Sequence, residues 1–394
     1  MRELIMNIIY GKIFLGVSAV LFAANALIAE NEYREIKLET SDNVPFGYSV
    51  AISGKSVAVG AGGRIHLYSD IGGESQKEIK IFPKDPRCYN FGASIAIGEN
   101  ILVAGAPNFE SNREQGAAYV FTDIYGANIK EKVLTASDGM SHSRTSYNGD
   151  WFGAAVCVSA KTVVVGAPHN DLNEGEAYVY FDIDSADCKE TQVLPPQNRK
   201  DCFAASVAYS DDILAVGAEG FPAFGGCVYV RKNFSKGGGD FIRLKPSDEF
   251  KEGSFGFSVA VTADAVFVGA PYHPDGKMRT GAVYIFTDVG TANQKSEILM
   301  PIGGKPEKFG ISIAASDSTL VIGAPLSNGG RGAVYVYTDV CGPNRKLVKI
   351  SPSDAVRGTH FGHSVAISGS IIAVSAPGQN KIRGAAYVYF PLTK

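Results

Sequence analysis

Trp151 is the only tryptophan of the chain and the residue best suited to anchor a ligand. It directly precedes a Phe-Gly pair, in a slot that mostly polar residues fill at the other copies of this pair. An exposed tryptophan offers a large apolar face and one N–H donor, which suits a sugar or a protein partner. The loop before it, residues 137–150, is the longest that we expect and adds Arg144 and Tyr147. The alternative is that Trp151 packs beneath this loop, and the sequence does not decide between the two.

Two further loops gather polar side chains that suit a polar ligand or a weak cation: His169 and Asp171 in one, and His273, Asp275 and Arg279 in the other. Ordinary solvated loops have the same composition, and we favour this simpler interpretation. The histidines are scattered over several repeats and share no centre, so we assign no metal site. No Ser-His-Asp or paired-carboxylate spacing recurs. We therefore assign no catalytic residue and do not expect an enzyme.

The charge balance argues against one class of partner. The chain has 37 basic and 40 acidic residues and a net charge of −3, whereas a nucleic-acid-binding surface normally needs a basic excess. It also contains 45 glycines, 22 phenylalanines and 18 tyrosines. This composition favours a turn-rich β protein that binds no nucleic acid.

A Phe-Gly pair recurs along the chain at intervals of roughly 50 residues. The copies begin at Phe46, Phe91, Phe152, Phe255, Phe309 and Phe361, and a further copy at Phe203 has alanine in place of the glycine. These positions mark the starts of seven units that fill residues 30–394 and leave no room for a second domain. Each unit contains short apolar runs bounded by Gly, Pro and Asp, which predict strands. Links as short as Ser53-Gly54-Lys55 predict antiparallel hairpins.

Both faces of the inner strands are apolar, so neighbouring sheets must cover both of them. We therefore predict an all-β fold, a seven-bladed β-propeller of four-stranded antiparallel blades. A β-solenoid is the alternative, but its repeats are usually shorter. The last unit ends after its third strand, and residues 34–42 match the outer strands of the other units. We expect this N-terminal segment to complete the last blade and close the ring.

Phe-Gly followed by Gly-Ala-Pro resembles the FG-GAP repeat. Gly-Ala-Pro is intact in four units, beginning at Gly105, Gly166, Gly269 and Gly323. The chain resembles the propeller of integrin α subunits, and still more the standalone microbial FG-GAP proteins. The resemblance implies a non-catalytic extracellular binding or adhesion module that contacts a protein or a glycan through its loop-rich face. The alternative is a carbohydrate-binding lectin or a polysaccharide-active propeller enzyme.

Integrin-like repeats often carry Asp-x-Asp-x-Asp-Gly calcium loops between their first and second strands. The corresponding links here are only a few residues long, as at Thr262-Ala263-Asp264. Calcium takes six to eight oxygen ligands, which such short links do not supply. We therefore expect no calcium site of this type and no cofactor.

Residues 1–29 resemble a secretory signal peptide. Lys12 precedes an apolar run that ends at Ala29, and small residues place cleavage near Ala26 or Ala29. An uncleaved membrane anchor is the alternative, although the run is at the short limit for a spanning helix. The signal predicts a secreted, extracellular or cell-surface protein, or a periplasmic one in a bacterium. Asn233 begins the single N-glycosylation sequon, which only a eukaryotic host would use.

Overall fold

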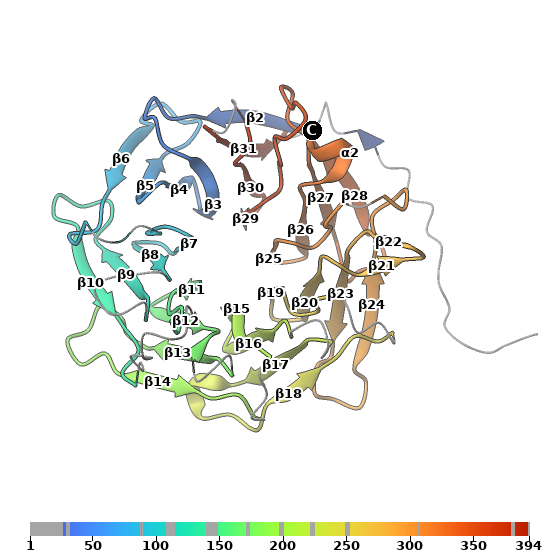
Figure 1. Cartoon of the computed structure of the whole chain (residues 1–394), viewed down its shortest axis with the longest axis horizontal. Coiled ribbons are helices and arrows are strands. Elements are labelled where there is room, and N and C mark those ends of the chain that lie inside the picture. The colour runs from blue at the N-terminus through green and yellow to red at the C-terminus, as the bar shows by residue number, and fades with distance from the viewer. Residues whose placement is uncertain are drawn as a thin grey trace, which may run out of the picture.

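Seven β-sheets, each with four antiparallel strands, form a closed ring in the computed structural model (Figure 1). The structure describes residues 27–28, 32–86, 88, 90–107, 115–138, 149–170, 174–196, 201–220, 225–248, 253–305, 307–379 and 383–392. The predicted fold class, an all-β seven-bladed propeller, is confirmed. Across these ranges, no helix has the length and apolar character needed to cross a membrane.

The first four blades are formed in chain order from their inner to their outer strands. Blade 1 contains β3 (Phe46–Ser53), β4 (Ser56–Ala61), β5 (Arg64–Ser69) and β6 (Lys77–Ile81). Blade 2 contains β7 (Ser94–Ile97), β8 (Ile101–Ala106), β9 (Ala117–Thr122) and β10 (Lys130–Leu134). Blade 3 contains β11 (Ala155–Ser159), β12 (Thr162–Ala167), β13 (Glu176–Tyr180) and β14 (Glu190–Val193). Blade 4 contains β15 (Phe203–Ser210), β16 (Ile213–Ala218), β17 (Cys227–Lys232) and β18 (Ile242–Leu244).

The remaining three blades follow the same plan. Blade 5 contains β19 (Ser258–Val261), β20 (Ala265–Ala270), β23 (Ala282–Thr287) and β24 (Lys295–Leu299). Blade 6 contains β25 (Ile313–Ser316), β26 (Thr319–Ala324), β27 (Ala333–Thr338) and β28 (Lys346–Ile350). Blade 7 contains β29 (Val365–Ser368), β30 (Ile371–Ala376) and β31 (Ala385–Pro391), and its outer strand is β2 (Tyr33–Leu38).

The pairing of β2 with β31 closes the ring, as the sequence predicts. The two strands are antiparallel, with a register that runs from Tyr33 opposite Pro391 to Leu38 opposite Ala386. A second link joins the same ends of the chain, because the backbone N–H of Phe46 donates to the carbonyl of Arg383 at 2.9 Å. Blade 7 is therefore built from both ends of the described chain.

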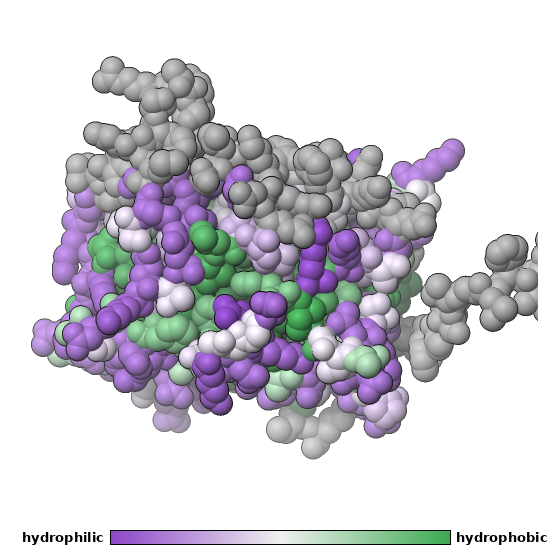
Figure 2. Space-filling model, turned by 90° about the horizontal axis from the view of Figure 1, so that it is seen from below, coloured by the Kyte–Doolittle hydropathy of each residue, from purple (hydrophilic) through white to green (hydrophobic). Residues whose placement is uncertain are grey.

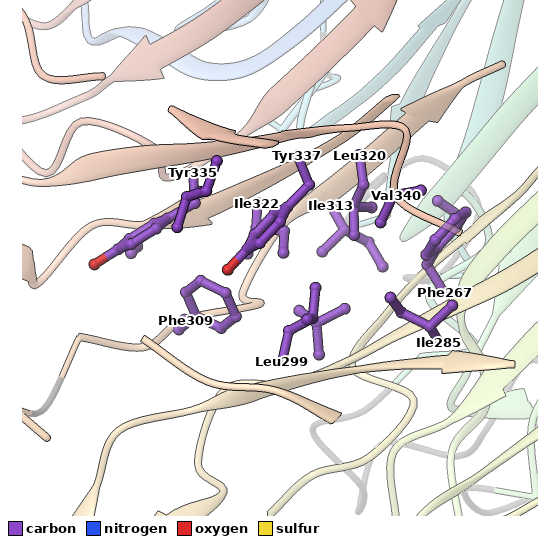
Figure 3. Packing of buried hydrophobic residues seen from close by; sticks show 14 of the residues in the cluster. Phe267, Ile285, Leu299, Phe309, Ile313, Leu320, Ile322, Tyr335, Tyr337 and Val340 are labelled. Atoms are coloured by element: carbon purple, nitrogen blue, oxygen red, sulfur yellow. The ribbon is translucent and has the colours of Figure 1, made fainter. Parts of the chain in front are cut away.

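The hydrophobic core lies between the blades. Each apolar cluster joins two adjacent blades, and one of them joins blade 7 to blade 1. The phenylalanine of each Phe-Gly pair lies in this core between two blades, beside an aromatic residue of the third strand. Figure 3 shows Phe309 below Tyr335, and the two ring centroids are 5.0 Å apart in an edge-to-face arrangement. The repeated phenylalanine therefore fills the gap between neighbouring sheets.

Backbone contact between blades explains the two glycines of the repeat. A Cβ atom at Gly269, of the Gly-Ala-Pro motif, would lie 2.1 Å from the carbonyl oxygen of Gly310 in the next Phe-Gly pair. The hydroxyl of Ser258 donates to the same carbonyl at 2.8 Å. Gly310 itself has a φ of 85°, which a residue with a side chain rarely adopts. Ala204 is the exception, because it adopts a φ of 67° at the equivalent place in blade 4.

Several short elements among the described residues lie outside the repeat and were not expected from the sequence. They are the hairpin of β21 (Pro274–Asp275) and β22 (Met278–Arg279), helix α2 (Ser327–Gly330), the 3-10 helix η2 (Phe234–Lys236), and β1 (Leu27–Ile28), which pairs in parallel with β28. The expected cleavage points at Ala26 and Ala29 lie outside the described residues.

Candidate functional site

A carboxylate that follows the outer strand of one blade bonds the next blade in several repeats. Asp354, after β28, accepts a hydrogen bond at 2.6 Å from the hydroxyl of Tyr387 in blade 7. Asp248, after β18, accepts one at 2.7 Å from the hydroxyl of Tyr284 in blade 5. These bonds tie consecutive blades together, so this repeated contact is part of the scaffold.

A lysine compensates the carboxylate in three blades. In blade 7, Lys37 lies opposite Tyr387 in the sheet register and its ammonium lies 2.6 Å from Asp354. The equivalent lysine of blade 1, Lys80, lies 2.8 Å from Asp42. In blade 6 the equivalent Lys349 donates to the hydroxyl of Tyr335 at 2.8 Å and lies 3.9 Å from Glu307. The carboxylate and the outer-strand lysine therefore balance each other in these blades.

Blade 3 departs from this pattern. The hydroxyl oxygen of Tyr178 lies 2.8 Å from a carboxylate oxygen of Asp138 and 2.8 Å from one of Glu176. The residue opposite Tyr178 on the outer strand is Gln192, not lysine, and its amide donates to both carboxylates. Among the residues that the structure describes, neither carboxylate forms an ion pair. We call Asp138, Asn170, Glu176, Tyr178 and Gln192 the blade-3 cluster.

Glu176 is the most unusual member of the blade-3 cluster. It lies opposite Ala167 in the register, a place that alanine fills in four other blades, at Ala117, Ala282, Ala333 and Ala385. Its exposed fraction is only 8%. Burial raises the pKa of this carboxyl, and the neighbouring charge of Asp138 raises it further.

The hydroxyl of Tyr178 faces two carboxyls in the blade-3 cluster. Tyr178 has a single hydroxyl proton, so it cannot donate to Asp138 and Glu176 at the same time. Burial raises the pKa of Tyr178, so the phenol keeps that proton. The Tyr178 hydroxyl therefore donates to only one of the two carboxyls at a time.

The Trp151 and His169 side chains contact each other beside the blade-3 cluster. Their ring centroids are 4.2 Å apart, and both residues are half-buried. The backbone N–H of His169 donates to the carbonyl of Asp150 at 3.2 Å. The next residue, Asn170, is buried and donates to the hydroxyl of Tyr178 at 2.8 Å. The structure therefore joins two of the sequence-predicted candidates, Trp151 and His169, to the cluster through Asn170.

The candidates of blade 5 are placed differently. His273 has an exposed fraction of 3%, and its Nε2 lies 2.6 Å from a carboxylate oxygen of Asp248. It therefore belongs to the interior contact between blades. Asp275 and Arg279 are exposed on the β21–β22 hairpin. Blade 4 separates this group from the blade-3 cluster (Figure 1), so the structure does not bring the two predicted loops together.

The other sequence-predicted residues fall into two groups. Arg144, Tyr147 and Asp171 lie outside the described residues. Asn233, of the sequon, is exposed in a left-handed turn with a φ of 52° that begins η2. In the part of the chain that the structure describes, no three His, Cys, Asp or Glu side chains are arranged to hold a metal ion.

A groove with a volume of about 380 Å³ lies on the outer rim where blades 3 and 4 meet, lined by Leu194, Pro196, Arg231, Gly238, Gly239, Asp240 and Phe241. Figure 2 looks at this side of the ring and shows apolar surface between hydrophilic margins. The guanidinium of Arg231 is already bonded, because two of its nitrogens donate to the carbonyl of Gly238. The groove is therefore a less polar surface than the blade-3 cluster.

The blade-3 cluster can bind a ligand that supplies donors. Asp138 and Gln192 are exposed, and the half-buried Trp151 is linked to the cluster through His169 and Asn170. The sequence analysis assigned Trp151 but missed Asp138, Glu176 and Gln192. The signal for Glu176 is present in the repeat, because Gly-Glu replaces the Gly-Ala that opens the third strand in most other units.

Comparison with protein families identifies the repeat. The family model described as "FG-GAP repeat" matches residues 129–180, 239–286, 294–337 and 345–389. Integrin alpha-4 of Xenopus laevis is 29% identical over 210 residues, which are 47% of this chain and 19% of that protein. Integrin alpha-2 of Mus musculus is 40% identical over 83 residues, which are 19% of this chain and 7% of that protein. The matches thus span less than a fifth of the length of these relatives.

Solved structures agree with the propeller architecture. The Pan2 WD40 domain of Neurospora crassa superimposes with a TM-score of 0.57 at 9% identity and covers 94% of this chain and 98% of its own. Hydrazine synthase of Kuenenia stuttgartiensis superimposes with a TM-score of 0.55 at 12% identity and covers 90% of this chain and 97% of its own. At these identities the likeness shows the fold alone.

Proposed function

Because the chain is an FG-GAP repeat protein whose propeller resembles the N-terminal region of integrin α subunits, we propose that it is a secreted or cell-surface adhesion module that binds an extracellular protein or glycan. The fold supports a binding module in general, and the family likeness favours a non-enzymatic one. The proposed contact surface is the loop-rich face at blade 3, with Trp151 as its aromatic anchor.

One observation carries this proposal. The half-buried Trp151 contacts His169, and the next residue, Asn170, bonds the Tyr178 hydroxyl that also contacts two carboxylates, neither of which forms an ion pair with any described residue. Blades 1, 6 and 7 compensate the equivalent carboxylates with a lysine. Blade 3 thus differs from these blades in having no lysine partner for its carboxylates, near a partly exposed tryptophan. The folding of the propeller does not require this difference.

Glycan and protein arrays probed with the purified propeller test the proposal. We expect Trp151→Ala to weaken binding at least tenfold, the loss of about 1.4 kcal/mol or more that an aromatic anchor gives. Tyr125→Ala is the matched control, because Tyr125 is a 48%-exposed aromatic residue in a turn between the third and fourth strands of blade 2. Equal binding by the two variants would remove Trp151 from the contact surface.

The proposed location has its own test. The signal-like segment supports export, and the proposal places the mature protein outside the cell or on its surface. N-terminal sequencing of protein recovered from the culture medium should show a start near residue 27 or 30. A protein that stays in the cytosol with its first residues intact contradicts this part of the proposal.

A polysaccharide-active enzyme is the second candidate, and one feature favours it. Asp138 and Glu176 both contact the same tyrosine hydroxyl, and burial raises the pKa of Glu176. Carboxyl pairs with separated pKa values perform acid–base work in glycoside hydrolysis. Release of reducing ends from a polysaccharide panel, abolished by Glu176→Gln, would support this candidate, and its absence across the panel would leave the binding module.

A further inference from the structure

Three exposed arginines lack a partner in the part of the chain that the structure describes. They are Arg331, Arg357 and Arg383, and none of their guanidinium groups forms a hydrogen bond, an ion pair or a ring contact with a described residue. The other described arginines each have an interaction of this kind or another electrostatic partner: Arg34, Arg64, Arg231, Arg243, Arg279 and Arg345. The described arginines without a partner therefore all belong to blades 6 and 7.

These arginines lie on the loop-rich face, each in a different connection. Arg331 lies between β26 and β27, Arg357 between β28 and β29, and Arg383 between β30 and β31. Trp151 lies between β10 and β11 and His169 between β12 and β13, which are the equivalent connections of blade 3, so all of them share one face of the ring. Blades 6 and 7 lie across the ring from blade 3 (Figure 1).

Backbone hydrogen bonds hold the three connections against one another. The carbonyl of Gly330 accepts a hydrogen bond from the N–H of Gly358 at 3.0 Å, and these glycines are the chain neighbours of the first two arginines. The N–H of Gly378 donates to the carbonyl of Thr359 at 3.1 Å and links the third connection to the same segment. The three basic side chains therefore start from adjoining backbone.

No carboxylate of these connections neutralises the arginines. Asp354 is the one acidic residue in their sequences, and it is already used, because the ammonium of Lys37 lies 2.6 Å away and the hydroxyl of Tyr387 donates to it. Three cations without a counter-ion on adjoining loops repel one another, so the stability of the fold does not explain them. The surface beside them is open, because no atom beyond the chain neighbours lies within 4 Å of the place of a Cβ atom at Gly329 or Gly358.

From this arrangement we infer that Arg331, Arg357 and Arg383 form a binding surface for the sulfate groups of a sulfated glycan. The planar guanidinium offers parallel N–H donors that match two oxygens of a tetrahedral oxyanion such as a sulfate ester. A sulfated glycan repeats this group along an extended polymer, which suits charges that come from three separate loops. The inference rests on the proposed function, and it names the class of glycan and a second contact place on the same face.

An acidic protein segment is the competing partner for a basic surface. Its carboxylates also bind guanidinium groups, but its flexible side chains lose conformational entropy when they are ordered, whereas sulfate groups are fixed on stiff sugar rings. The net charge of the chain is −3, so the molecule as a whole does not attract a polyanion. Binding of a sulfated polymer therefore requires a local basic surface such as this one.

Dextran sulfate is the probe for this surface, and neutral dextran of the same length and poly-L-glutamate are its counterparts. The full chain is presented to each immobilised polymer, and equilibrium binding is measured by biolayer interferometry at low and high salt. We expect binding to dextran sulfate and none to neutral dextran, with weaker binding at high salt because salt screens exposed charges. Poly-L-glutamate bound as tightly as dextran sulfate would identify an acidic protein as the partner and overturn the inference.

A triple variant tests the location of the surface. Arg331→Gln, Arg357→Gln and Arg383→Gln together remove the three charges and should weaken binding to dextran sulfate at least about tenfold. All three side chains are exposed, so the thermal unfolding midpoint should stay that of the parent and show that the fold is intact. Undiminished binding in this variant would overturn the inference.

A second triple variant removes the same charge from the opposite face. Lys77, Lys295 and Lys346 are exposed where the outer strands β6, β24 and β28 begin, and their replacement by glutamine should leave binding unchanged. Equal losses in the two triple variants would mean that the net charge alone governs binding, which also overturns the inference.

Failure of this inference can be distinguished from failure of the proposed function. Binding to dextran sulfate that is lost in the arginine variant and kept in Trp151→Ala supports the inference, whatever the arrays show for Trp151. A parent protein that binds its array ligand through Trp151 and does not bind dextran sulfate overturns the inference and leaves the proposed function in place.

Discussion

Blades 3 and 5 build the same contact and use it differently. In both, an aspartate after the preceding outer strand accepts a hydrogen bond from the third-strand tyrosine, at Asp138 and Tyr178 in blade 3 and at Asp248 and Tyr284 in blade 5. In blade 5 a buried histidine, His273, covers the carboxylate. In blade 3 the aspartate is exposed, and the ring of the histidine in the equivalent loop, His169, contacts Trp151.

This comparison distinguishes contacts that hold the propeller together from residues that are candidates for function. A contact that recurs from blade to blade is explained by the need to tie neighbouring sheets together. Glu176, Gln192 and the Trp151–His169 pair have no such explanation, because the other blades close without them. We therefore look for function where a blade departs from the repeat, and the following predictions test that view.

The largest effect is expected from removing the shared aspartate in the two blades. Asp248→Ala leaves the buried His273 and the hydroxyl of Tyr284 without this acceptor and should cost about 2–4 kcal/mol of stability. Asp138→Ala should cost less than about 1 kcal/mol, because Tyr178 keeps Glu176 as an acceptor and Asp138 is exposed. Urea unfolding of the two variants measures the difference. Equal losses would show that the blade-3 aspartate is as structural as that of blade 5.

A smaller effect concerns pH and belongs to blade 3 alone. The pKa of Glu176 in the folded protein is raised above its ordinary value of 4.5, so the folded state holds this proton more tightly than the unfolded state. This contribution to stability is complete below 4.5 and is lost as pH rises through the folded pKa. Glu176→Gln should therefore lose less stability than the parent over this window.

Unfolding midpoints measured across this pH range provide the check. Glu99→Gln is the control, because Glu99 is exposed in the hairpin turn of blade 2 and should follow the parent curve. A Glu176→Gln curve parallel to that of the parent would mean that the buried carboxyl is not the source of the pH dependence.

The smallest effect is expected from adding the missing cation. Gln192→Lys should raise stability by about 0.2–1 kcal/mol, and the gain should shrink in high salt because one partner of the new pair is exposed. Ile298→Lys at the equivalent position of blade 5 should give no gain, because His273 already bonds Asp248. Thermal unfolding at low and high salt distinguishes the two. A similar gain in both blades would contradict the view that blade 3 lacks the compensation that blade 5 has.

Much of the fold could be predicted because close backbone contacts between blades require particular residue types at fixed positions of each repeat. Phe309, Gly310 and Gly269 are each required by packing between sheets, so their types recur and can be counted in the sequence. Ring closure could be predicted for the same reason, since β2 repeats the pattern of an outer strand.

The candidate site could be predicted only in part. Trp151 is recognisable by its rarity, but His169 and His273 look alike in the sequence and differ in the structure by which neighbour they reach. Glu176 stands where most other units have alanine. Its contacts depend on which residues occupy positions 192 and 138, and Gln192 and Asp138 lie 16 residues after it and 38 residues before it. These three residues meet only in the folded protein, so their contacts could not be predicted from the sequence pattern.

The strand pairing of blade 7 has a consequence for how the molecule forms. The hydroxyl of Tyr389 bonds Glu35 across a sequence separation of 354 residues. Contacts this distant carry a large loop-closure entropy, so they form late. Six blades can assemble from local hairpins as they leave the ribosome, while the seventh must wait for the other end of the chain. A nascent polypeptide of this design therefore stays an open arc until β31 has been synthesised and can pair with β2.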